Sequence, residues 1–147
     1  MNWIIFVVGA ILSWGTYGVS LAKGQAILGP MKALLGVGLA YFLVAVLAPV
    51  IALRTQGGVS GFGGAGAGFS ILGGLLGAAG AVCIIYAFRN GGSPLIVMPL
   101  VFGGAPIINA ITTMLVTPPK TAPSPMLFLG FLMAAAGGGL VLYYKPH

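Results

Sequence analysis

The sequence contains no aspartate and no glutamate in its 147 residues, and its charged residues amount to only 4%. A soluble globular domain carries about a quarter charged residues, because its surface must be hydrated. Hydrophobic residues make up 59% of this chain. A surface so poor in charge is not solvated by water, so the composition predicts an integral membrane protein.

The missing carboxylates also exclude several kinds of chemistry. Neither a carboxylate pair nor a Ser-His-Asp triad can form, and the one histidine, His147, is the last residue. We therefore predict no enzymatic activity, no metal site and no cofactor. A proton relay through a membrane carboxylate is excluded as well. The single cysteine, Cys83, lies in an apolar run, where we expect a small buried packing residue.

The positive charge does not indicate nucleic-acid binding. The six lysines and arginines stand singly between apolar runs and form no basic patch. Cations in loops set membrane topology and meet anionic lipid headgroups. We expect membrane lipids rather than nucleic acid as partners, and the charge distribution favours an external N-terminus and an internal C-terminus.

Five apolar stretches are long enough to cross a membrane, which requires roughly 20 residues. They predict an all-α, polytopic helix bundle of about five transmembrane helices, forming a single domain over residues 1–147. Residues 23–32 are expected to connect the first two spans. The glycine-rich link before the third span could extend that helix, and a short link predicts an antiparallel hairpin of the third and fourth spans. The predicted spans are 2–22, 33–53, 69–88, 93–116 and 126–144.

The fourth span combines apolar residues with helix breakers. Each internal proline removes a backbone hydrogen bond and frees a carbonyl, so we expect a helix kinked by prolines. In lipid this cost is tolerated where other protein groups or water donate hydrogen bonds to the freed carbonyls. One interpretation is a kinked helix packed through small residues, with Asn109 bonded to another helix, and the other is a cavity wall. At 100° per residue, a sector of roughly 120° holds Pro99, Gly103, Pro106, Asn109, Ala110 and Thr113.

Polar and aromatic residues also share a face of the first span. Ser13, Tyr17 and Ser20 follow helical spacing, and Trp14 lies mid-span, where its N–H needs a partner. This pattern favours a substrate-sized cavity over simple packing. In the third span, Gly73 and Gly77 form a GxxxG pattern, which predicts close approach of helix backbones.

Two segments resemble a known transporter family. "SWGTYGVSLAKG", and "YAFRNGGSPLIVMPLVFGGAPIINAITTMLV" followed by "FLGFLMAAAGGGLVLYY", are similar to the EamA-type five-helix half-repeat of the drug/metabolite transporter superfamily. Full-length members carry two inverted repeats around a central cavity, so the resemblance implies a homodimer or another membrane subunit. Together with the polar face of the fourth span, the resemblance gives the expected substrate-binding residues: Trp14, Tyr17, Tyr86, Asn90, Ser93, Pro99, Asn109 and Thr113.

Two functions follow as hypotheses. The first is a multi-pass inner-membrane transporter protomer for a neutral, zwitterionic or anionic small metabolite. It would act as a dimer by alternating access, with the fourth helix rocking about Pro99 and Pro106 around a cavity lined by the first, third and fourth helices. Loss of transport in Pro→Ala variants tests that movement. The alternative is a non-transporting subunit of a larger membrane complex.

Overall fold

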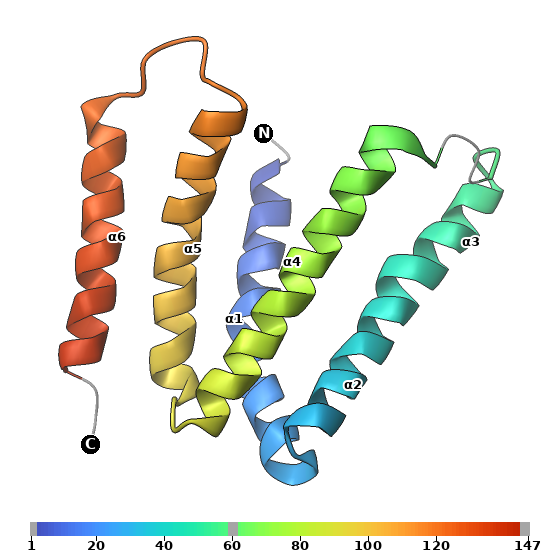
Figure 1. Ribbon diagram of the computed structural model, residues 1–147, viewed down its shortest axis with the longest axis horizontal. Helices are drawn as coiled ribbons and strands as arrows, with labels where there is room; N and C mark the ends of the chain where they lie inside the picture. Colours follow the sequence, from blue (N-terminus) through green and yellow to red (C-terminus); the bar gives the residue numbers. More distant parts are fainter. Residues whose placement is uncertain (1–2, 59–61, 145–147) are drawn as a thin grey trace. The chain divides into compact units, whose positions relative to one another are not determined.

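The protein is all-helical in the computed structural model, which describes residues 3–58 and 62–144 (Figure 1). Within these residues, five helical spans are long and apolar enough to cross a membrane, as the sequence predicts, and this supports a multi-pass membrane protein. The second span, Pro30–Arg54, comprises two α-helices and a π-helical turn, η1. The elements are α1 (Trp3–Leu28), α2 (Pro30–Phe42), η1 (Leu43–Leu47), α3 (Ala48–Arg54), α4 (Gly64–Arg89), α5 (Pro94–Val116) and α6 (Pro125–Tyr143).

The first two spans are joined by a single residue, which corrects the predicted connection at 23–32. Helix α1 continues to Leu28, and α2 begins at Pro30. Gly29 between them has a φ of 82°, a left-handed conformation that glycine adopts without steric cost. Proline at a first helical position loses no hydrogen bond. The tight turn keeps Lys23 and Gln25 within α1, so their side chains lie on a helix rather than in a loop.

The π-helical turn lies just before Pro49. Proline has no N–H for the carbonyl of Ala45, and its ring would collide with that carbonyl in a regular α-helix. The chain instead forms a wider turn, in which the N–H of Ala48 donates to the carbonyl of Leu43. The span thereby passes the proline without ending, and its helical path continues to Arg54.

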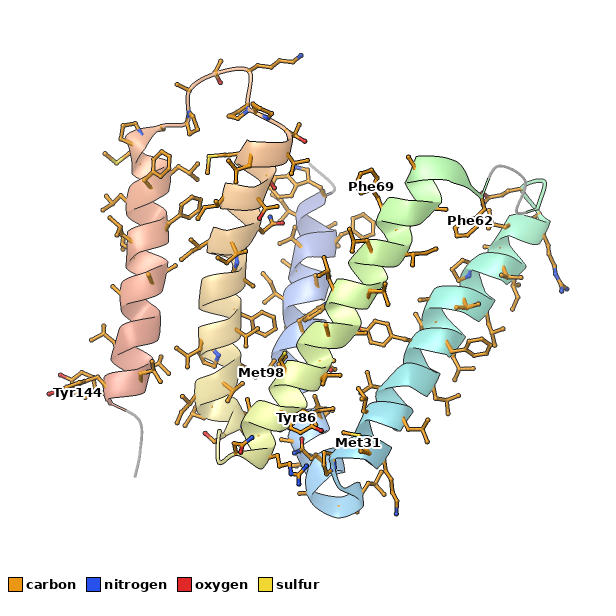
Figure 2. The ribbon with its side chains drawn as sticks, viewed as in Figure 1. Met31, Phe62, Phe69, Tyr86, Met98 and Tyr144 are labelled. Carbon is orange, nitrogen blue, oxygen red and sulfur yellow. The ribbon has the colours of Figure 1, made fainter. Side chains whose placement is uncertain are left out.

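The chain groups into two compact units, 1–91 and 92–147, which are described separately. In the first unit, α1, α2 and α4 contact one another. Its core is small and lies near the Gly29 turn, where Ile85 is fully buried. Figure 2 shows Met31 and Tyr86 at this end of the unit and Phe69 at the other. The core comprises Gly18, Leu21, Ala33, Ala81, Ile84 and Ile85. A single domain over 1–147 stays a prediction.

Gln25 connects two helices of the first unit. Its side-chain N–H (Nε2) donates to the carbonyl of Ile85 at 3.0 Å, which holds the end of α1 beside the end of α4. Its Oε1 atom is buried without a hydrogen-bond partner among the described residues. An amide in an apolar setting is costly unless bonded, so this contact fixes how the helix ends meet.

In the second unit, α5 and α6 pack on each other. A Cβ on Gly103 would lie 3.5 Å from the carbonyl oxygen of Ala134, and a Cβ on Gly138 would lie 3.5 Å from Leu100. These glycines therefore bring the two helices close together. Helix α6 begins at a capped end, because Ser124 accepts a hydrogen bond from the N–H of Met126 at 3.3 Å.

One packing prediction for α4 is wrong, and another finds no partner helix among the described residues. Cys83 is exposed instead of buried. Gly73 and Gly77 are exposed too, and a Cβ on either would meet no atom within 4 Å. The physical reason is that α4 contacts α1 and α2 near the Gly29 end, while its first half projects beyond the small core. These positions are free to meet lipid or another chain.

Candidate functional site

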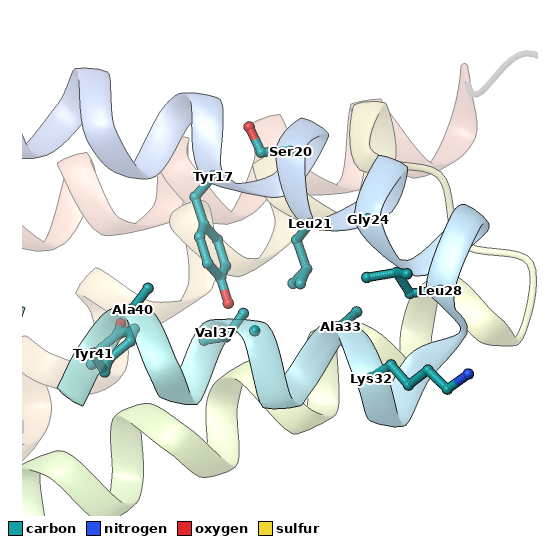
Figure 3. Close-up of a pocket in the computed structure, with 11 residues that line it drawn as sticks. Tyr17, Ser20, Leu21, Gly24, Leu28, Lys32, Ala33, Val37, Ala40 and Tyr41 are labelled. Carbon is teal, nitrogen blue, oxygen red and sulfur yellow. The ribbon is translucent and has the colours of Figure 1, made fainter. Parts of the chain in front are cut away.

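A groove of about 420 Å³ lies along the contact between α1 and α2 (Figure 3). Its volume falls in the range of roughly 300–1,000 Å³ usual for small-molecule sites. The groove exists because small residues face each other across the two helices. These residues are Gly24 on α1 and Ala33, Gly36 and Ala40 on α2. A Cβ on Gly24 or Gly36 would lie within 4 Å of no atom of the described chain, so space remains between the helices.

One wall of the groove comes from the second half of α1. It combines apolar side chains with two hydroxyl groups, those of Tyr17 and Ser20. The Ser20 hydroxyl donates back to the carbonyl of Thr16 at 3.2 Å, so its proton is already used within the helix. The residues of this wall are Tyr17, Ser20, Leu21, Gly24 and Leu28.

The other wall comes from α2 and has a polar residue at each end. Figure 3 shows Lys32 at one end, with its amine pointing away from Tyr17, and Tyr41 at the other. At 1.5 Å per residue they stand roughly 14 Å apart along the helix. Since the sequence has no acidic residue, no side chain of the chain neutralises Lys32. The residues of this wall are Lys32, Ala33, Gly36, Val37, Ala40 and Tyr41.

The phenol of Tyr17 is the most distinctive polar group in the groove. Its ring reaches from α1 toward α2 (Figure 3). The hydroxyl oxygen is buried and has no hydrogen-bond partner among the described residues. A buried hydroxyl without a partner costs about 1–3 kcal/mol, so it favours a partner from outside the chain.

A smaller cavity of about 120 Å³ adjoins the groove and shares Tyr17 and Tyr41 with it. Ser13 and Trp14 complete its lining. The rings of Trp14 and Tyr17 are 6.0 Å apart and tilted by 45°, a usual geometry for an aromatic pair. Two of the eight predicted binding residues, Trp14 and Tyr17, thus lie side by side on a cavity wall.

Tyr86 and Asn90 lie at the end of α4 and line neither cavity. The side chain of Asn90 donates to the carbonyl of Tyr86 at 2.8 Å and closes the helix end. The guanidinium of Arg89 lies 5.9 Å from the centre of the Tyr86 ring, a cation–π distance. Both predicted residues are exposed, and their visible contacts are local to the helix end.

The other four predicted residues belong to the second unit. Ser93 immediately precedes α5 and is half-buried. Pro99, Asn109 and Thr113 are exposed, so α6 does not cover them. Helix α5 is continuous past both internal prolines. Helix α6 packs on the neighbouring face, which includes Leu100 and Gly103. A role of Pro99, Asn109 and Thr113 in lining a cavity therefore requires protein from outside this unit and stays a prediction.

The groove residues of α2 are absent from the sequence-based set. The sequence places Lys32 in the predicted connection at 23–32, and the second span shows no polar motif. A signal was present nevertheless. Ala33, Gly36 and Ala40 recur at helical spacing, with Tyr41 next to them, which marks one face of small residues bordered by a phenol.

No protein-family model, curated protein or solved structure matches the chain. The resemblance to the EamA-type half-repeat therefore stays a prediction from sequence, and function is argued from the groove itself.

Proposed function

We propose that the protein is an inner-membrane transporter protomer that binds a neutral, zwitterionic or anionic small metabolite and acts as a dimer by alternating access. The observation that carries this proposal is the buried Tyr17 hydroxyl, unpaired among the described residues, on a groove of about 420 Å³. Binding sites of this kind are mostly apolar, with a few placed polar groups.

The composition supports the same substrate classes. A chain without acidic residues offers no carboxylate to hold a cation, whereas Lys32 and the phenols offer donors to anions and neutral acceptors. The resemblance to a half-repeat supports the dimer, because one repeat encloses only half of such a cavity. The large exposed apolar faces of α1 and α2 also suit burial against a second copy or lipid.

Ligand-induced thermal stabilisation of the purified protein tests the proposal. A panel of neutral, zwitterionic and anionic metabolites is screened by the unfolding temperature, because a ligand that binds the folded state raises it. We expect at least one compound to stabilise the wild type and Tyr143→Phe but not Tyr17→Phe. Tyr143 is the matched control, because its exposed ring lies outside the groove. Equal stabilisation of both variants would remove Tyr17 from the site.

The second candidate is a non-transporting subunit of a larger complex. It is favoured by the glycine face of α4, where Gly73 and Gly77 meet no described atom and so offer close approach to a foreign helix. Purification in mild detergent separates the two functions. A homodimer supports the transporter, and stoichiometric unrelated chains together with no stabilising ligand support the subunit.

A further inference from the structure

We propose that the α1–α2 groove selects a single-chain amphipathic anion, with its hydrocarbon chain along the groove and its carboxylate or phosphate at Lys32. This inference rests on the proposed function and narrows the substrate class of the same site. It comes from the distribution of polarity along the groove, which is uneven.

The middle of the groove is apolar. Leu21 from α1 and Val37 from α2 line this part, and the small residues beside them leave an open channel along the two helices (Figure 3). A hydrocarbon chain fills such a channel without leaving polar groups unpaired. A compact polar metabolite would instead lose its hydrogen bonds to water against these apolar side chains. The Tyr17 hydroxyl could replace only one of those hydrogen bonds.

The end of the groove at Lys32 is cationic. Lys32 lies two residues after the beginning of α2, and the Gln25–Ile85 hydrogen bond holds the last turns of α1 and α4 at the same end of the unit. Arg89 lies on the last turn of α4, and Lys23 lies about one turn before the last turn of α1. Because the sequence has no carboxylate side chain, no side chain of the protein can form an ion pair with Lys23, Lys32 or Arg89. An anion for these charges comes from a ligand or a lipid headgroup.

The apolar channel and its cationic end together fit one kind of occupant. The cation stands at a helix beginning, where a membrane span reaches the headgroup level, and the apolar channel extends from it toward the membrane interior. The Tyr17 hydroxyl lies within the channel, where it can form a hydrogen bond with a polar atom of the bound ligand or with a water beside it. A single chain matches a groove of this volume, and a bulky two-chain lipid is the competing outcome in the test.

Binding is measured on the full chain in phosphatidylcholine nanodiscs with a photoreactive long-chain carboxylate. We expect saturable labelling of α1 and α2, with the matched long-chain alcohol and a short-chain carboxylate competing poorly. Lys32→Gln should weaken binding about fivefold, the upper range for loss of one partly exposed charge interaction. Lys120→Gln is the control and should bind normally, because Lys120 lies in the exposed connection between α5 and α6.

A second pair of variants tests occupation of the groove independently of Lys32→Gln. Gly36→Leu should fill the channel and abolish labelling, whereas Gly38→Leu, on the same helix but outside this groove, should not. A Cβ meets no atom within 4 Å at either glycine, so both variants should fold. Equal binding of carboxylate and alcohol, unaffected by Lys32→Gln, would overturn the selectivity. Competition by two-chain anionic lipid alone would overturn the single-chain assignment. Stabilisation by another metabolite would still leave the proposed function standing.

Discussion

At the scale of single residues, a few polar side chains provide the directional hydrogen bonds of this apolar protein. Tyr17 faces the groove with a hydroxyl that has no hydrogen-bond partner in the described part of the chain, whereas the Ser20 hydroxyl donates to the carbonyl of Thr16 in its own helix. Gln25 reaches across to Ile85. The spacing of Tyr17 and Ser20 was readable from the sequence, but which hydroxyl is engaged was not, because back-bonding depends on the rotamer.

Removal of the Gln25 side chain tests its role as an interhelical link. Gln25→Ala loses the bond to Ile85 and leaves a gap between α1 and α4, so we expect about 1–2 kcal/mol lower stability. Thermal unfolding in detergent measures this change. Gln56→Ala is the matched control, because Gln56 is exposed in the turn after α3. Equal unfolding temperatures for the two variants would show that the link contributes nothing.

At the scale of helices, length and apolar runs predicted the spans, but packing fixed their ends and faces. The sequence stretch from 23 to 32 contains glycine and proline and so reads as a loop. The structure uses Gly29 alone for the turn and keeps the rest helical. Helix α4 begins at Gly64, within the glycine-rich link, since a backbone in an apolar setting gains most by bonding to itself.

The contact of α5 with α6 provides a test at this scale. Gly103 faces the carbonyl of Ala134, whereas a Cβ on the adjacent Gly104 meets nothing within 4 Å. We expect Gly103→Leu to force the helices apart and to lower stability by about 1–3 kcal/mol, as overpacking does. Gly104→Leu should be nearly neutral. Thermal unfolding of both variants decides the matter, and a Gly104→Leu protein that is the less stable would contradict this packing.

At the scale of the whole molecule, the described residues bury few large side chains, and apolar groups cover most of the surface. The class of protein was therefore predictable from composition alone. The groove was not, because it depends on which faces of two adjacent spans meet at the Gly29 turn. The predicted roles of Pro99, Asn109 and Thr113 concern a face that α6 leaves uncovered, so they depend on partners beyond the second unit.

The most direct test of the account is uptake of the stabilising compounds by proteoliposomes containing wild type, Gly36→Leu or Gly38→Leu. If the α1–α2 groove is the transport site, wild type and Gly38→Leu should take up at least one compound at similar rates. Gly36→Leu, with the channel filled, should fall to the level of empty liposomes. Undiminished uptake by Gly36→Leu, or no uptake by wild type above empty liposomes, would contradict the account.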